Sequence, residues 1–156
     1  KKTIKSSWQK DIDVNLTSVK NIIDIFSKKM IKNKTGNIVN IGSDLSVIAP
    51  DQKIYADIKN YIKPLSYSVT KHGIVGITKY YASLFGKYNV RVNCLSPGGV
   101  FNNQNKKFVK KVSKYIPLGR MANKNDYNGF IVFLSSNETK YMTGHNLVVD
   151  GGRTII

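Results

Sequence analysis

Three short segments rich in β-branched residues, separated by helical patterns, constrain the fold of this chain more than any other feature. They read "NIVNIGS", "VRVNCLS" and "HNLVVD", at residues 37–43, 90–96 and 145–150. Strands that alternate with helices form parallel sheets joined by right-handed crossovers. The sequence therefore predicts an α/β fold of the Rossmann type, a doubly wound parallel sheet of which about three strands and their flanking helices are present.

The helical segments are marked by apolar periodicity and by capping residues. The first is predicted at residues 6–31, where apolar residues recur in steps of three and four and form one buried stripe. The stripe consists of Trp8, Ile12, Val19, Ile22 and Phe26. Further helices are predicted at residues 66–87, 103–115 and 123–136, the last capped by Asn123 or Asn125. Residues 44–65, punctuated by two prolines, are predicted to be irregular.

The stretch "YSVTK" places Tyr67 and Lys71 four residues apart in the second predicted helix. Residues at this spacing share one helix face, and a nearby cation favours the ionised form of a phenol. Such a pair can donate and accept a proton near neutral pH. Taken alone, the pattern also fits an amphipathic helix that carries an unrelated tyrosine and a surface lysine.

Other polar residues fall where the same site would need them. Ser43 follows the first predicted strand and Pro97-Gly98 follow the second. The carboxyl ends of parallel strands meet at one edge of the sheet, where open α/β folds bind their ligands. Asn15 lies in the gap of the apolar stripe, where a polar group needs hydrogen-bond partners. These signals together predict a site at that edge.

Five segments, in this order, resemble the short-chain dehydrogenase/reductase family. They are "WQKDIDVNL", "GNIVNIGS", "YSVTKHGIVGITKYYA", "VRVNCLSPGGV" and "GRMANKNDYNGFIVFLSSNETKYMTGHNLVVDGG". The resemblance covers nearly the whole chain, from Trp8 to Gly152. It implies an NAD(P)-dependent oxidoreductase, with NAD or NADP as cofactor, that interconverts an alcohol and a carbonyl.

The resemblance also implies roles for individual residues. Tyr67 would be the general acid and base, and Lys71 would hold the nicotinamide ribose and favour ionisation of Tyr67. Ser43 would hydrogen-bond the reacting oxygen, and Asn15 would hold a water linked to Lys71. The catalytic set is Asn15, Ser43, Tyr67 and Lys71. The cofactor-binding set is Tyr67, Lys71, Pro97, Gly98, Val100 and Asn102, in which Asn102 replaces the threonine that the family often has.

Two further departures from the family shape the expectations. No glycines are spaced as GxxxGxG or GxGxxG, the pattern of the family's phosphate-binding loop. Residues 1–156 are therefore expected to be the C-terminal catalytic portion of a single domain whose Gly-rich half is absent. The interval between Ser43 and Tyr67 is also about twice the usual one. In this enlarged loop Tyr55, Lys59 and Lys63 would meet an anionic substrate or be solvated.

Composition limits the other classes of function. The chain has 25 basic and 9 acidic residues and a net charge of +16, which suits binding to nucleic acid or to anionic substrates. The lysines are scattered, however, so a solvated surface is favoured over nucleic-acid binding. Cys94 is the only cysteine, so no disulfide within the chain and no metal site are expected. No stretch approaches the roughly 18 apolar residues of a membrane span.

The sequence thus predicts a cytoplasmic oxidoreductase with a small-molecule substrate and with neither a nucleic-acid nor a membrane partner. The long loop, "PGGVFNNQ" and "YMTGHNLVVDGG" resemble family members associated with bacterial surface-sugar biosynthesis, which implies a sugar or nucleotide-sugar substrate. The family also implies a homo-oligomer, a dimer or tetramer when full length, formed through residues 6–31 and 66–87. The alternatives are a truncated, non-catalytic fragment or interaction module, and a basic nucleic-acid binder.

Overall fold

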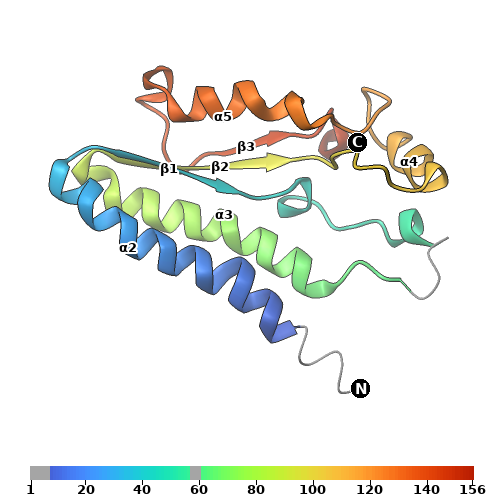
Figure 1. Cartoon of the computed structure of the whole chain (residues 1–156), viewed down its shortest axis with the longest axis horizontal. Helices are drawn as coiled ribbons and strands as arrows, with labels where there is room; N and C mark the ends of the chain where they lie inside the picture. Colours follow the sequence, from blue (N-terminus) through green and yellow to red (C-terminus); the bar gives the residue numbers. More distant parts are fainter. Residues whose placement is uncertain (1–7, 57–60) are drawn as a thin grey trace.

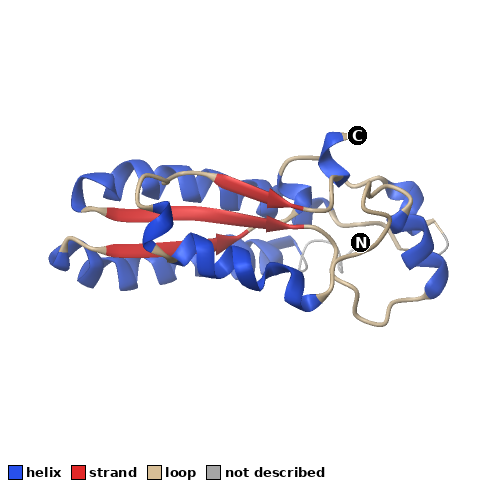
Figure 2. Ribbon diagram, turned by 90° about the horizontal axis from the view of Figure 1, so that it is seen from above, coloured by secondary structure: helices blue, strands red, loops and turns tan. Residues whose placement is uncertain are grey.

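A computed structural model describes residues 8–56 and 61–156 of the chain (Figure 1). Three strands form one parallel sheet in the order β1 (Gly36–Ile41), β2 (Val90–Pro97) and β3 (Asn146–Val149). The register pairs Gly36 with Val90 at the start of the sheet. The three predicted strands and their parallel arrangement are confirmed, and all three strands point the same way in Figure 2.

Helices cover both faces of this sheet. The helices α2 (Ser18–Asn33) and α3 (Leu65–Phe85) lie on one face and α5 (Asn128–Ser135) lies on the other (Figure 1). The short helix α4 (Lys106–Ser113) lies beyond the carboxyl ends of the strands. This arrangement leaves the carboxyl edge of the sheet to be enclosed by loops and by α4.

The central strand β2 carries the core. Its residues Val92 and Cys94 are fully buried. Tyr81 and Phe85 of α3 pack with Ile23 of α2 in one apolar cluster that includes β2. Burying a side chain of this size contributes about 1.5–3 kcal/mol. The contact of α2 and α3 with the sheet is therefore an apolar one, and it anchors α3 on the sheet.

The first helical segment departs from the predicted stripe. Residues 8–12 are α-helical, but Asp13–Thr17 form a turn of π-helix before α2 begins. A π turn holds more residues than an α turn, so it changes which residues after it face the core. Val19 packs against the core as predicted and Ile23 is buried, whereas Ile22 and Phe26 are exposed, so the predicted stripe is wrong at these last two positions. Residues 6 and 7 of the predicted helix lie outside the described residues.

The other predicted elements are present with shifted ends. The helix predicted at 66–87 is α3, which Pro64 precedes in an extended conformation. The segment 123–136 begins as a 3-10 turn, Lys124–Tyr127, before α5, and Asn123 caps it with a capping box. The prediction of Asn123 as the cap is thus confirmed. Residues 44–56 contain the 3-10 turns Asp44–Ser46 and Gln52–Tyr55.

No helix among the described residues is long and apolar enough to cross a membrane. In the same part of the chain, no cluster of three or more His, Cys, Asp or Glu side chains could hold a metal ion.

Candidate active site

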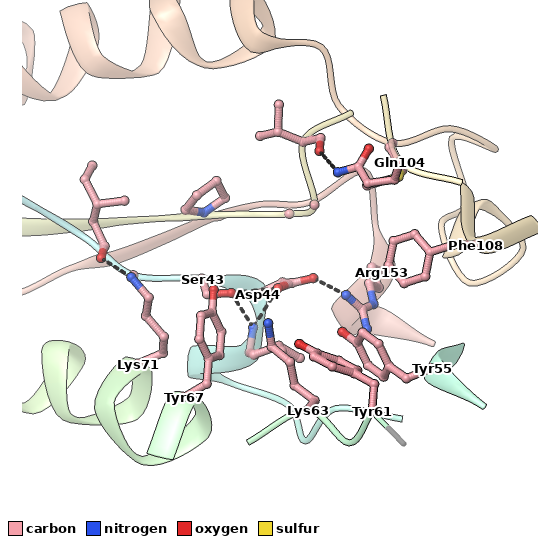
Figure 3. A pocket seen from close by; sticks show the side chains of 18 of the residues that line it. Ser43, Asp44, Tyr55, Tyr61, Lys63, Tyr67, Lys71, Gln104, Phe108 and Arg153 are labelled. Carbon is pink, nitrogen blue, oxygen red and sulfur yellow. Dashed lines mark hydrogen bonds and ion pairs between the residues drawn. The ribbon is translucent and has the colours of Figure 1, made fainter. Parts of the chain in front are cut away.

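An open cavity of about 740 Å³ lies at the carboxyl edge of the sheet (Figure 3). It is enclosed by the ends of β1 and β2, the first turns of α3, the loop before α3, and α4. Of the predicted site residues, it is lined by Ser43, Tyr67, Lys71, Pro97, Gly98 and Val100. Asn15 and Asn102 do not line it. Six of the predicted residues thus lie together around one cavity at this edge, and their roles stay predictions.

The first turns of α3 present Tyr67 and Lys71 to the cavity from the same side of the helix, as predicted (Figure 3). The Lys71 Nζ lies 5.9 Å from the centre of the Tyr67 ring. It donates a hydrogen bond of 3.1 Å to the backbone oxygen of Ile41, the last residue of β1. Burial lowers the pKa of Lys71, partly offset by the charge that Cys94 can carry. Lys71 is thus held by the sheet while its ammonium faces the cavity.

Ser43 is buried at the point where β1 gives way to a 3-10 turn. Its hydroxyl donates to the Asp44 Oδ1 at 2.9 Å and accepts from the Leu45 backbone N–H at 3.2 Å. Ser43 from the end of the strand and Tyr67 from the helix line the same cavity (Figure 3). Both therefore lie on the same edge of the sheet, and the role of Ser43 toward a reacting oxygen stays a prediction.

Asn15 lies in the π turn and is half-buried. Its Nδ2 donates to the backbone oxygen of Asp11, 3.0 Å away in the same helix. The amide thus reaches back to its own helix, and the expected role of Asn15 in holding a water linked to Lys71 stays a prediction. A π turn is often found at a functional site, and this one packs against α3 where Leu16 meets Gly73.

The turn after β2 is fixed by contacts that sequence reasoning missed. The Gly98 N–H donates to the Val149 oxygen at 2.9 Å. The Gln104 side chain closes the turn, donating to the Val100 oxygen and accepting from the Asn102 N–H. The Asn102 side chain is exposed outside the cavity. Its predicted place in the cofactor-binding set therefore stays a prediction.

One end of the cavity is lined by residues absent from the predicted catalytic and cofactor sets. They are Asp44, Tyr55, Tyr61, Lys63, Phe108 and Arg153. Tyr55 and Lys63 line the cavity, where they could meet a substrate as one of the two expectations for the enlarged loop proposed. Lys59 lies outside the described residues. Asp44 and Arg153 form a buried ion pair of 2.5 Å. No local pattern could have linked these two residues, since they lie 109 residues apart in the sequence.

The three-stranded parallel sheet, with a Tyr–Lys pair and a strand-end serine at its carboxyl edge, defines the chain as an α/β protein of the Rossmann type. A family model described as "Enoyl-(Acyl carrier protein) reductase" matches residues 1–154. The chain belongs to the short-chain dehydrogenase/reductase family, as the resemblance of its motifs indicated.

Individual proteins resemble the chain in sequence, and those of solved structure also resemble it in fold. The chain is 34% identical over 154 residues to an uncharacterized oxidoreductase, YgcW, of Escherichia coli, covering 95% of this chain and 55% of that protein. A short-chain dehydrogenase of Leptospira borgpetersenii with bound NAD+ is 37% identical, with a TM-score of 0.87 over 94% of this chain and 56% of that one.

A gluconate 5-dehydrogenase of Burkholderia cenocepacia, in complex with NADP and tartrate, is 26% identical, with a TM-score of 0.86. That match covers 97% of this chain and 57% of the other. The chain thus spans a little over half the length of the relatives it matches.

Proposed function

We propose that residues 1–156 form the C-terminal catalytic portion of an NAD(P)-dependent oxidoreductase that interconverts an alcohol and a carbonyl. The observation that carries this proposal is the common orientation of Tyr67 and Lys71 from α3 into a cavity that Ser43 also lines. Bound NAD or NADP would supply or accept the hydride at the substrate carbon. The residues of this chain would bind the nicotinamide half of the cofactor, orient the substrate and transfer the proton.

The residues around Lys71 suit the nicotinamide half of such a cofactor. An ammonium has three donors, and one of those on Lys71 is used by the Ile41 oxygen. Donors therefore remain for the hydroxyls of a ribose in the cavity. The turn of Pro97, Gly98 and Val100 lies across the same cavity and offers backbone groups to a carboxamide. These residues fit the cofactor, and the Asn102 side chain is left outside the set.

The proton would pass through Tyr67. In the direction of reduction, its hydroxyl would donate a proton to the substrate oxygen, and Lys71 would stabilise the tyrosinate that results. Ser43 would orient that oxygen with its hydroxyl, which would have to turn from the Asp44 carboxylate that now accepts from it. Asn15 would act from beside α3, through a water in the widened turn.

The substrate and the assembly are parts of the same proposal. We place the substrate among sugars or nucleotide sugars, because Tyr55, Tyr61 and Phe108 offer aromatic faces at the far end of the cavity. We expect a homo-oligomer, because α2 exposes Ile22, Ile25 and Phe26, each more than half exposed, and large exposed apolar surface marks an interaction site. A cytoplasmic location suits the buried thiol of Cys94.

Turnover of a substrate panel tests the proposal. The protein is used in a form that includes the Gly-rich, cofactor-binding half that residues 1–156 lack. It is incubated with NAD+ or NADP+ and a panel of polyols and sugars, and reduced nicotinamide is followed by its absorbance. Replacing Tyr67 by Phe removes the proton donor, so we expect turnover to fall about 10²- to 10⁴-fold. Tyr80→Phe is the matched control, because Tyr80 lies on the same helix and is exposed.

Two results would count against the proposal. A Tyr67→Phe variant as active as the parent would remove Tyr67 from its role. A well-folded protein that includes the Gly-rich half but shows no turnover with either cofactor would favour the non-catalytic alternative.

A further inference from the structure

The backbone of Lys63 is fixed by its neighbours Gln52 and Pro64. The side-chain amide of Gln52 accepts from the Lys63 N–H at 3.0 Å and donates to the Lys63 carbonyl at 3.2 Å. Pro64 follows, with a fixed φ of −61°, and precedes the first turn of α3. Clamped on one side and stiffened on the other, the Lys63 backbone directs its side chain into the cavity (Figure 3).

The Lys63 ammonium has an aromatic neighbour but no carboxylate partner among the described residues. Its Nζ lies 3.7 Å from the centre of the Tyr67 ring. The nearest acidic group lining the cavity, Asp44, is already bound by Arg153, by the Ser43 hydroxyl and by the Leu45 N–H. Burial is the main cause that lowers the pKa of Lys63. Lys63 is thus a half-buried cation with unused donors.

The wall beside Lys63 is aromatic. The ring of Tyr55 lies 5.5 Å from that of Tyr61 and 5.8 Å from that of Phe108, measured between centres. These rings join the loop before α3 to the helix α4 and close the far end of the cavity (Figure 3). A ligand that reaches Lys63 therefore places its body against aromatic faces and its reacting carbon near Tyr67.

We propose that the substrate carries an oxyanion, a carboxylate or a phosphate, that binds to Lys63 a few bonds away from the carbon that reacts at Tyr67. This inference rests on the proposed function and narrows its substrate to a small anionic hydroxy or oxo compound. The charges favour it: among the described residues that line the cavity, Lys63, Lys71 and Arg153 are basic and only Asp44 is acidic. Since Asp44 neutralises Arg153 and Lys71 is assigned to the ribose of the cofactor, Lys63 is the described cation of the lining that is left to meet the anion.

Binding of matched probes tests this inference without any turnover. D-gluconate, sorbitol 6-phosphate and neutral sorbitol differ in the anionic group on a similar six-carbon body. Their affinities are measured by calorimetry at constant ionic strength, with and without NAD+, for the parent, Lys63→Met and Lys63→Arg. We expect one or both anions to bind the parent about ten- to a hundredfold more tightly than sorbitol. A preference for gluconate alone identifies a carboxylate, and a preference for sorbitol 6-phosphate alone identifies a phosphate.

The variants decide whether Lys63 causes the preference. Lys63→Met should lose it, and Lys63→Arg should keep most of it because the positive charge remains. Lys53→Met is the matched control, since Lys53 belongs to the same loop, is exposed and does not line the cavity; it should bind as the parent does. Gln52→Ala, which frees the Lys63 backbone but keeps its charge, should weaken the preference.

The outcomes separate this inference from the proposed function. A Tyr67→Phe variant that loses turnover but keeps the preference for anions would support both. Equal binding of all three probes by the parent, no measurable binding of either anion, or an undiminished preference in Lys63→Met would overturn the role of Lys63. None of these three results would touch the test of Tyr67 by turnover.

Discussion

Replacing Arg153 by Met should destabilise the fold by about 3–5 kcal/mol, the usual cost of removing one partner of a buried ion pair. The side chains of Arg153 and Asp44 are only 9% and 5% exposed, and the Arg153 NH1 lies 2.5 Å from the Asp44 Oδ2. The Oδ1 of Asp44 already accepts from the Ser43 hydroxyl and the Leu45 N–H. Without Arg153, the Asp44 carboxylate would stay buried with its second oxygen unpaired.

The chain contains a matched pair in which the geometry is the same but the burial is not. Arg120 and Asp126 meet at 2.6 Å, and their side chains are 52% and 34% exposed. Exposed pairs are screened by water and contribute little. Arg120→Met should therefore change the free energy of unfolding far less than Arg153→Met does. The comparison separates the effect of burial from that of distance.

Urea unfolding followed by circular dichroism measures both changes. A domain of this kind is stable by about 5–15 kcal/mol, so the Arg153→Met midpoint should fall by about a fifth or more while the slope stays unchanged. Asp44→Asn should also be destabilising, and the double variant less so than the sum of the two, because the residues interact directly. An Arg153→Met change no larger than that of Arg120→Met, or strict additivity, would refute the reasoning.

Two further predictions concern α3. Gly76→Ala should stabilise the fold by up to about 1 kcal/mol, because nothing lies within 4 Å of the added carbon. At Gly73 the added carbon would lie 2.8 Å from the Leu16 Cδ2, so Gly73→Ala should not bring this gain. Thermal unfolding of both variants checks this, and an equal gain at Gly73 would contradict it. Burial, together with the hydrogen bond to Asp24, raises the pKa of Tyr81 to about 12. An unfolded tyrosine ionises near 10, so the folded state holds more protons between pH 10 and 12 and the free energy of unfolding falls as the pH rises through that range. Tyr81→Phe should lose that part of the slope in urea titrations, and an unchanged slope would contradict the assignment.

Residues at the ends of strands could be placed from the sequence because few positions satisfy the pattern. Ser43 and Pro97 each follow a β-branched run, and in a parallel sheet such ends share one edge. The prediction that Tyr67 and Lys71 share one helix face needed only the periodicity of that helix. These are local rules, and the cavity brings the four residues together as they require.

Residues placed by long-range or irregular structure could not be predicted in this way. The π turn at Asp13–Thr17 changes the buried face of the helix that follows, and a regular period therefore assigned Phe26 to the core although it is 63% exposed. Arg153 reaches Asp44 across 109 residues of sequence, a contact that only the complete fold forms. Gln104 closes its turn with an amide that no motif marks.

Lys63 and Lys71 flank Tyr67 at the same spacing in the sequence, four residues on either side, and yet the fold gives them different surroundings. Because Pro64 stands just before α3, Lys71 lies within the helix and Lys63 before it. Lys71 donates to the Ile41 oxygen at the end of the sheet, and this bond holds its ammonium 5.9 Å from the centre of the Tyr67 ring. Lys63 lies over the Tyr67 ring with no acceptor among the described residues, so its ammonium gains most from a ligand that brings one. The first arrangement suits a permanent partner of the reaction, and the second suits a residue that selects the substrate.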